Sequence, residues 1–176
     1  MDVQRIYEKA RRVRVAVFDV DGVLTDGALP FAGAGDELKI FNVQDGHGMK
    51  LLQESGVELA VITSRSSRAV EERMRNLGVA LLFQGAQDKI TAFGELIARL
   101  RVEPDAAAYI GDDLQDLPVM RRCGLAATVP GAPAPVRRHA HYVTRARGGH
   151  GAAREWCELI LHAQGALPAR LAAFLA

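Results

Sequence analysis

The sequence is poor in the features that define several protein classes. It has only two cysteines, Cys123 and Cys157, so it lacks both a disulfide framework and a cysteine metal site. No apolar run approaches the roughly 20 residues that a membrane-spanning helix needs. The segment Met1–Arg14 is charged throughout and lacks the apolar core of a signal peptide. We therefore expect a cytoplasmic protein with no membrane partner.

An excess of charge of one sign is also missing. The chain has 22 Lys and Arg against 21 Asp and Glu, and aromatic residues make up only 6%. Basic patches interleaved with aromatics, which favour nucleic-acid binding, are not found. An anionic substrate would need a local cluster of cations. The 176 residues, of which 49% are hydrophobic, fit one domain over residues 1–176.

Short apolar runs alternate with segments of helical spacing. Strands buried on both faces are expected at Val13–Phe18, Leu59–Ile62, Leu81–Phe83, Ala107–Ile110 and Leu125–Val129. Helices are expected at Gly48–Glu54, Ser66–Leu77, Lys89–Leu100, Leu114–Arg121 and Ala152–Gln164. This alternation predicts an α/β fold of the Rossmann-like kind, with a doubly wound parallel sheet.

One segment, 26–42, interrupts the alternation. Within it, Ala28–Phe31 and Glu37–Phe41 flank a glycine-containing turn and predict a β-hairpin inserted after the first strand. At about a dozen residues the insertion is too short to form a cap domain. Pro130–Pro135 is expected to be a loop, and the C-terminal tail 148–176 begins with two glycines before its helix.

Polar side chains follow four of the expected strands at their carboxyl ends, where ligands bind in such folds. Asp19 and Asp21 follow the first strand and Thr63 follows the second. Lys89 begins the helix after the third strand, and Asp112 follows the fourth. Carboxylates at one edge repel each other unless a cation lies between them, and Mg²⁺ prefers such oxygen ligands.

These residue types suit the hydrolysis of a phosphate ester in two displacements. Of Asp19 and Asp21, one can attack phosphorus, which gives an aspartyl-phosphate, while the other handles protons. Thr63 and Lys89 suit the phosphoryl oxygens. Each feature alone has a structural explanation as a turn, a helix cap or a solvated side chain. Their joint occurrence at four strand ends favours a magnesium-dependent phosphohydrolase.

The same residues resemble the four motifs of the haloacid dehalogenase superfamily of phosphatases. The matching motifs are Asp19-Val20-Asp21-Gly22-Val23-Leu24-Thr25, Thr63, Lys89 and Gly111-Asp112-Asp113-Leu114-Gln115-Asp116. Within this superfamily, the chain resembles the capless, tetrameric family of 3-deoxy-D-manno-octulosonate 8-phosphate phosphatases over roughly residues 13–165. The further matching segments are Phe41–Gly48, Ile62–Arg65, Gln84-Gly85, Tyr109–Asp113, Asp116–Met120, Tyr142–Arg145 and Gly148–Ala152.

The resemblance implies a role for each motif residue. Asp19 would be nucleophile and metal ligand, and Asp21 would be the general acid/base and give the metal its backbone carbonyl. Asp112 would complete the metal ligands, while Thr63 and Lys89 would hold the phosphoryl group. Asp113 and Asp116 would support the site. The implied substrate-binding residues are Asp21, Asn42, Val43, Gln44, Asp45, Gly46, Lys50, Arg65, Arg73 and Lys89.

The resemblance also implies a substrate, a pathway and an assembly. The substrate would be a small-molecule sugar-acid phosphate, hydrolysed to free sugar acid and phosphate in lipopolysaccharide precursor synthesis. The assembly would be a homotetramer in which the hairpins meet and neighbouring subunits help to close each site.

Two positions depart from the family pattern. Ser64 stands where glycine is common, and His150 stands where the family often carries arginine. Histidine is shorter and only partly charged near neutral pH. A 2-keto-3-deoxynononate 9-phosphate phosphatase, or a phosphatase for another sugar phosphate, is therefore an alternative. A non-catalytic oligomeric binding module is a second alternative, which the intact motif residues disfavour.

Overall fold

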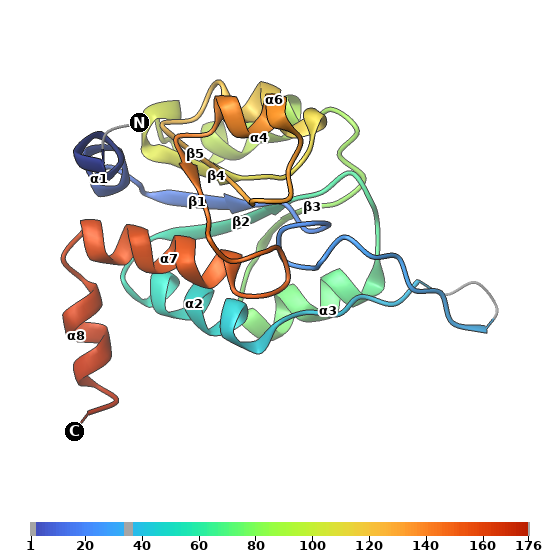
Figure 1. Ribbon diagram of the computed structural model, residues 1–176, viewed down its shortest axis with the longest axis horizontal. Helices are drawn as coiled ribbons and strands as arrows, with labels where there is room; N and C mark the ends of the chain where they lie inside the picture. Colours follow the sequence, from blue (N-terminus) through green and yellow to red (C-terminus); the bar gives the residue numbers. More distant parts are fainter. Residues whose placement is uncertain (1–2, 34–36, 176) are drawn as a thin grey trace.

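The centre of the molecule is a six-stranded parallel sheet with helices on both faces (Figure 1). The computed structural model describes residues 3–33 and 37–175. The strand order is β3-β2-β1-β4-β5-β6. The strands are β1 (Val15–Phe18), β2 (Glu58–Ile62), β3 (Leu81–Phe83), β4 (Ala107–Ile110), β5 (Leu125–Thr128) and β6 (Tyr142–Val143).

The helices form one layer on each face of the sheet. They are α1 (Val3–Arg11), α2 (Val43–Glu54), α3 (Arg68–Leu77), α4 (Lys89–Leu100), α5 (Leu117–Met120), α6 (Ala134–His139), α7 (Ala152–Ala163) and α8 (Leu167–Ala172). The core of one face is built with α1, α2, α3 and α7, and that of the other with α4, α5 and α6. None of the described helices is long and apolar enough to cross a bilayer.

Strand β1 lies at the middle of both cores because its side chains alternate between the two faces. Ala16 and Phe18 pack into one core, while Val15 and Val17 pack into the other. The Phe18 ring meets the fully buried Trp156 ring of α7 edge to face, with centroids 5.1 Å apart. Truncating a buried aromatic of this kind typically costs about 3–5 kcal/mol, so β1 is held firmly at its place.

The five expected strands and the α/β fold are confirmed, with differences at several boundaries. Helix α2 begins at Val43 rather than Gly48, because the Asn42 side chain caps it by accepting from the Gln44 backbone N–H at 2.7 Å. Strand β6 was not predicted, since two residues carry no periodic signal. The loop expected at Pro130–Pro135 is wrong in its last residues, where α6 begins with a proline in its first turn.

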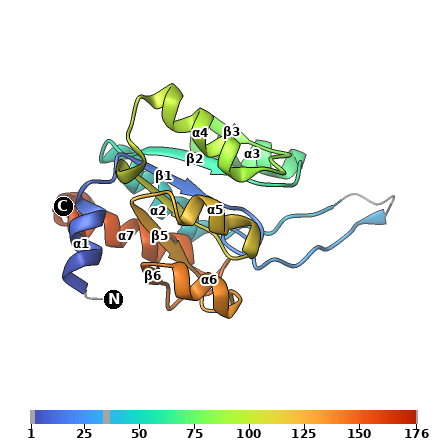
Figure 2. The same ribbon diagram turned by 90° about the horizontal axis from the view of Figure 1, so that it is seen from above.

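The inserted hairpin projects away from the body of the molecule at the carboxyl edge of the sheet (Figure 2). Among the described residues its two arms pair through one antiparallel bridge, Phe31 with Glu37, and a hydrogen bond from the Leu38 N–H to the Pro30 carbonyl at 2.9 Å. Part of the expected turn, residues 34–36, lies outside the described residues. No cap domain is evident in the described chain, as expected.

The connection order places a crevice between β1 and β4. From this central pair the chain continues outward to β2 and β3 on one side, and to β5 and β6 on the other. Ligands bind at such switch points, outside the carboxyl ends of the strands. The Asp19 N–H donates to the Ile110 carbonyl at 3.0 Å, so the segments that leave both strands begin side by side.

Candidate active site

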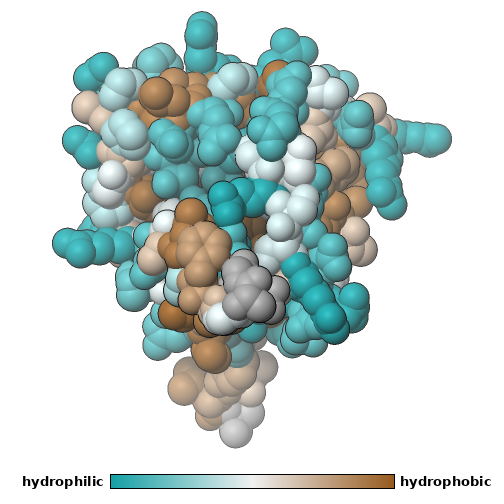
Figure 3. Space-filling model, turned by 90° about the vertical axis from the view of Figure 1, so that its right-hand side faces the viewer, coloured by the Kyte–Doolittle hydropathy of each residue, from teal (hydrophilic) through white to brown (hydrophobic). Residues whose placement is uncertain are grey.

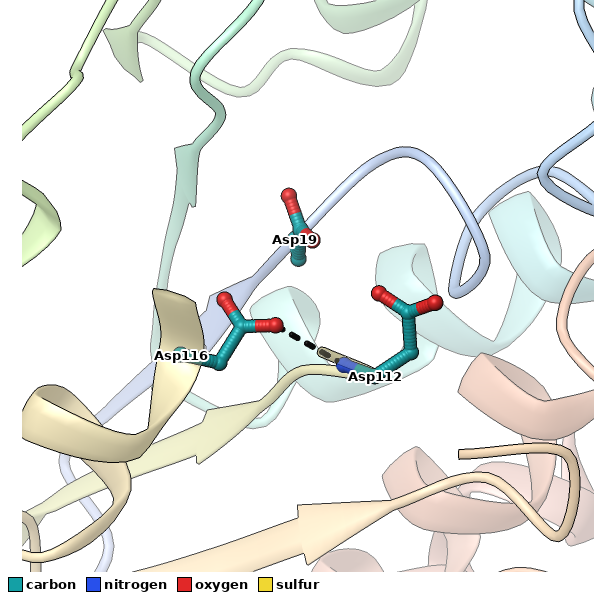
Figure 4. A group of neighbouring side chains, drawn as sticks. All are labelled: Asp19, Asp112 and Asp116. Atoms are coloured by element: carbon teal, nitrogen blue, oxygen red, sulfur yellow. Dashed lines mark hydrogen bonds between the residues drawn. The ribbon is translucent and has the colours of Figure 1, made fainter. Parts of the chain in front are cut away.

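Three carboxylates converge at the switch point (Figure 4). Asp19 follows β1, Asp112 follows β4, and Asp116 ends a short 3-10 turn, Leu114–Asp116. One carboxylate oxygen from each lies within 4.8 Å of those of the others. The sequence predicted that Asp19 and Asp112 meet here, and the structure brings them together.

The Asp116 carboxylate is already occupied by protein donors. Its Oδ1 accepts from Lys89 Nζ and from the Tyr109 hydroxyl, both at 2.6 Å. Its Oδ2 accepts from the backbone N–H groups of Asp112 and Asp113, both at 2.9 Å. Burial and the charge of Asp116 raise the pKa of Tyr109 well above its ordinary value, which keeps that hydroxyl protonated as a donor. Asp116 therefore positions its neighbours and has little capacity left to bind a metal.

Lys89 connects Asp19, the predicted nucleophile, to Asp116. It begins α4, its side chain is almost fully buried, and its Nζ lies 3.0 Å from Asp19 Oδ2 in addition to its bond with Asp116. Burial alone would lower the pKa of Lys89, but the charges of Asp19 and Asp116 outweigh burial and raise it. The ammonium is therefore a fixed positive charge beside Asp19, as a phosphoryl-binding group requires.

The site has more negative charge than its protein neighbours neutralise. With all three carboxylates ionised, the single ammonium would leave an excess of two negative charges, which one divalent cation would balance. Burial and the nearby Asp116 raise the pKa of Asp19 to about 8, and burial with Asp116 and Asp113 raises that of Asp112 to about 7. A cation between Asp19 and Asp112 would relieve this destabilisation, so the donor set fits Mg²⁺.

The Asp21 side chain turns away from this cluster. Its Oδ1 forms an ion pair with Lys39 Nζ, on the returning arm of the hairpin. The side chains grouped in the described chain are thus those of Asp19, Asp112 and Asp116, whereas Asp21 was predicted as a ligand through its backbone carbonyl. Gly22, at φ +86°, carries the loop so close to Asp112 that a Cβ there would lie 2.0 Å from its Oδ2.

The loop after β2 places the other predicted phosphate-binding group. Thr63 is buried at the end of β2, and its N–H and carbonyl are bonded to Phe83 and Ala86. Ser64 is accommodated without a left-handed backbone, and its hydroxyl donates to Gln115 Oε1 at 2.8 Å. Arg65, a predicted substrate-binding residue, is paired with Glu37 of the hairpin.

The predicted substrate residues around α2 do not join the cluster within this chain. The buried Asp45 carboxylate accepts from the Gly151 and Arg154 backbone N–H groups at 3.2 and 2.8 Å, which caps α7. Arg73 donates to the Asn42 carbonyl at 3.0 Å and lies over the Phe41 ring. Gly46 packs against the Arg73 guanidinium, and Val43, Gln44 and Lys50 are exposed. Asn42 and Asp45 thus have structural roles in the monomer.

A cleft of about 520 Å³ opens beside Asp112. Its walls include Gly22 and Asp26 from the loop after β1, and Arg147 and His150 from the loop before α7. Neither Arg147 nor His150 forms an ion pair in the part of the chain that is described. The cleft has the size of a small-molecule site, and its lining includes the guanidinium of Arg147. His150 therefore faces the site of its own chain.

The loop that carries Arg147 and His150 is fixed against the loop after β1. The Gly149 N–H donates to the Val23 carbonyl at 2.9 Å, and a Cβ at Gly148 would lie 1.8 Å from the Gly22 carbonyl oxygen. Glu155 holds the other end of the loop through the N–H groups of Arg145 and Ala146. The close packing requires glycine at 148.

We expect Gly148→Ala to lower turnover without unfolding the protein. The added methyl group would push the loop after β1, and with it Asp21, out of position, and misplacement by about 1 Å can cost about 100-fold in rate. Steady-state kinetics and circular dichroism measure both effects. Gly131→Ala is the matched control, because Gly131 lines the same cleft and a Cβ there meets nothing within 4 Å. Equal activity of the two variants would contradict the expectation.

Three residues of the site were missed at the sequence level. Tyr109 lies in the middle of an apolar strand, where an aromatic residue indicates packing rather than a donor to Asp116. Lys39 lies between two apolar residues in the hairpin, and Arg147 is a surface residue in a loop. Tyr109 lies in a segment that matches the family, but the match implied no role for its side chain, and no motif or spacing distinguished Lys39 or Arg147. The roles of all three depend on contacts between distant segments.

Comparisons with known proteins agree with this geometry. A model of haloacid dehalogenase-like hydrolases matches residues 32–124. The 3-deoxy-D-manno-octulosonate 8-phosphate phosphatase of Yersinia pestis is 46% identical over 162 residues, which cover 92% of this chain and 87% of that protein. A solved structure of a probable yrbi family phosphatase from Pseudomonas syringae has a TM-score of 0.97 at 50% identity and covers 98% of both chains.

One further solved structure bears on the ligands. The 3-deoxy-D-manno-octulosonate 8-phosphate phosphatase of Moraxella catarrhalis, in complex with a magnesium ion, a phosphate ion and a KDO molecule, has a TM-score of 0.97 at 43% identity. The match covers 98% of this chain and 99% of that chain. The predicted fold and the resemblance to this family are confirmed.

Proposed function

Because the chain belongs to the haloacid dehalogenase-like hydrolase family, we propose that it hydrolyses 3-deoxy-D-manno-octulosonate 8-phosphate to the free sugar acid and phosphate. The observation that carries the proposal is the meeting of Asp19, Asp112 and the Asp116–Lys89 pair at the switch point. The guanidinium of Arg147 in the lining of the adjoining cleft supports an acidic substrate. Formation of a lipopolysaccharide precursor and a cytoplasmic location belong to the same proposal.

In the proposed reaction Asp19 attacks phosphorus and the ester bond to the sugar breaks. Asp21 gives a proton to the leaving oxygen, and it then takes a proton from the water that attacks the aspartyl-phosphate. Lys89 and Thr63 hold the phosphoryl oxygens, while Asp116 keeps Lys89 in place. Mg²⁺, held by Asp19, Asp112 and the Asp21 backbone carbonyl, would offset the charge of the phosphoryl group.

The test is phosphate release from a panel of keto-sugar-acid phosphates, with Mg²⁺ and with a chelator. The proposal expects a preference for the eight-carbon ester and loss of activity without the metal. If the enzyme instead prefers 2-keto-3-deoxynononate 9-phosphate or another sugar phosphate, the proposed substrate is wrong, but the proposed phosphatase mechanism still holds. Absence of turnover with every ester in the presence of Mg²⁺ would favour the non-catalytic binding module.

We further propose that the chain assembles as a homotetramer through the hairpin. Four large apolar side chains of the hairpin are exposed: Leu29, Phe31, Leu38 and Ile40. Figure 3 looks onto this edge and shows apolar residues gathered on it. Burying such a side chain is worth about 1.5–3 kcal/mol, so a second copy that offers the same face is a suitable partner. The exposed first turn of α2, with Val43 and Gln44, would then meet a neighbouring subunit.

Charging the outer face of the hairpin should dissociate the assembly. We expect Leu38→Asp combined with Ile40→Asp to sediment as a smaller species than the wild type, because two carboxylates would have to be buried in the interface. Val3→Asp, at an exposed apolar position of α1, is the control and should leave the sedimentation unchanged. A wild-type protein that sediments as a monomer would contradict the proposal.

A further inference from the structure

The hairpin carries a lysine whose side chain is covered and pairs with Asp21 in the candidate active site. The Lys39 side chain is only 1% exposed, although it belongs to the projecting arm. Its Nζ forms ion pairs with Asp21 Oδ1 and, at 2.6 Å, with Glu37 Oε1. An ammonium is removed from water only at a large cost unless it is well paired, so this position needs an explanation beyond surface charge.

Along the returning arm of the hairpin, successive side chains alternate between an outer and an inner face. Leu38 and Ile40 point outward and are 51% and 73% exposed, while Glu37 and Lys39 point toward the site. An extended segment places successive side chains on opposite faces. The outer face is therefore apolar, and the inner face supplies charges to the catalytic edge.

The inner charges link the two loops that hold the substrate. Lys39 contacts Asp21 in the loop after β1, and Glu37 contacts both Lys39 and Arg65, which lies in the loop after β2. The series runs Asp21, Lys39, Glu37, Arg65, with alternating sign and no net charge. It ties the returning arm of the hairpin to the loops after β1 and β2.

We propose that Lys39 is a positioning residue for Asp21. This inference rests on the proposed phosphatase function, in which Asp21 transfers the proton in both displacements. Lys39 binds Oδ1 of Asp21, and this leaves Oδ2 as the oxygen that carries the proton toward the leaving group. A general acid must be held within hydrogen-bond reach of the atom that it protonates. Glu37 and Arg65 keep Lys39 itself from moving away.

The test compares Lys39→Met and Lys39→Arg on two esters. For an alkyl phosphate such as the sugar ester, loss of a positioned general acid should lower kcat by about 100-fold or more while KM changes much less. p-Nitrophenyl phosphate has a leaving group that needs no protonation. The first displacement releases p-nitrophenolate in a rapid burst, and this burst should be retained in Lys39→Met. The steady-state rate that follows should be lower than in the wild type, because hydrolysis of the aspartyl-phosphate still needs Asp21.

Two further variants separate positioning from folding. Lys39→Arg keeps the positive charge and should recover most of the alkyl-ester activity. Lys9→Met removes a lysine whose Nζ donates to the Gly124 carbonyl at 2.8 Å, far along the sequence from the site, and should leave both esters unaffected. If Lys39→Met does not fold, Glu37→Gln replaces it in the test. This variant keeps the ion pair between Lys39 and Asp21 but weakens the contact between Glu37 and Lys39, so it should show the same ester-dependent loss on a smaller scale.

An equal loss of the first displacement on both esters, or full activity of a folded Lys39→Met, would overturn the inference. If the wild type turned over neither ester, the proposed function itself would fail, and the ratio between the esters would have no meaning.

Discussion

Asp19→Asn should abolish turnover while leaving the fold intact. The amide cannot displace the ester oxygen from phosphorus, and removing a nucleophile typically lowers kcat by roughly 10⁴-fold or more. The free energy of unfolding of the metal-free variant should be equal to that of the wild type or higher. The reason is that burial and the nearby Asp116 make the ionised Asp19 unfavourable, which raises its pKa to about 8.

This expectation has a definite dependence on pH. The folded protein binds the Asp19 proton more tightly than the unfolded chain, so the metal-free wild type loses stability as the pH rises from the ordinary pKa of 3.8 to about 8. The stability advantage of Asp19→Asn should therefore grow over that interval and vanish at low pH. Chemical denaturation in the presence of a chelator measures it.

The control is Asp105→Asn, the same chemical change at an exposed position just before β4. It should change neither turnover nor the pH dependence of stability. Phosphate release by Asp19→Asn at the wild-type rate would exclude the aspartyl-phosphate mechanism.

Asp116→Ala should impair both stability and turnover. Asp116 is fully buried and accepts from Lys89, Tyr109 and two backbone N–H groups. Its removal leaves the buried Lys89 ammonium with Asp19 as its ion-pair partner and deprives the Tyr109 hydroxyl and the two N–H groups of their acceptor. Breaking a buried ion pair of this kind typically costs about 3–5 kcal/mol. Turnover should fall as well, because Lys89 loses the contact that aims it at the phosphoryl group.

Asp113 offers a matched control for Asp116. It is the exposed cap of the same 3-10 turn, and its carboxylate accepts from the Leu114 N–H at 2.7 Å. Loss of such a cap typically costs about 1 kcal/mol, so Asp113→Ala should be mildly destabilised and active. The account of Asp116 is contradicted if the two variants have the same unfolding free energy.

Asp19→Asn and Asp116→Ala together distinguish a residue that reacts with the substrate from one that holds the site in place. Asp19 and Asp116 are both buried carboxylates in contact with Lys89, yet one substitution should remove activity at no cost in stability and the other should reduce both. The difference follows from their partners, since Asp19 accepts from the Val20 N–H and pairs with Lys89, whereas Asp116 has four donors.

The parallel sheet and the central site residues could be predicted because their signals are local. Val15–Phe18 is a β-branched and aromatic run, and its carboxyl end places Asp19 at the edge without knowledge of any other segment. Asp112 follows β4 in the same way. The carboxyl ends of neighbouring parallel strands lie side by side, so the positions of Asp19 and Asp112 after two strands were enough to predict that they meet in one cluster.

In the hairpin, the hydrophobic pattern of the sequence does not predict which side chains are buried. Leu38 and Ile40 alternate with Lys39, and in a half-buried strand the apolar residues would face the core. In the structure the alternation is inverted, because the hairpin projects from the body and its inner face covers a charged site. Which face is inside depends on the tertiary arrangement and, in our proposal, on a second copy.

The roles of Asn42 and Asp45 were also outside the reach of sequence. Both carry oxygen side chains in a segment that resembles a substrate-binding motif, and in this chain they cap α2 and α7. Asp45 meets the backbone of Arg154 across 109 positions of sequence. A contact between such distant segments leaves no trace in spacing or periodicity.

The central claim is that Asp19 becomes phosphorylated during turnover. Rapid quenching of the enzyme with 3-deoxy-D-manno-octulosonate 8-phosphate and Mg²⁺, followed by borohydride reduction, converts an aspartyl-phosphate to homoserine, which peptide mass spectrometry locates. We expect homoserine at position 19 in the wild type and none in Asp19→Asn. Phosphate release without modification at position 19, or with modification of another carboxylate, would contradict the account.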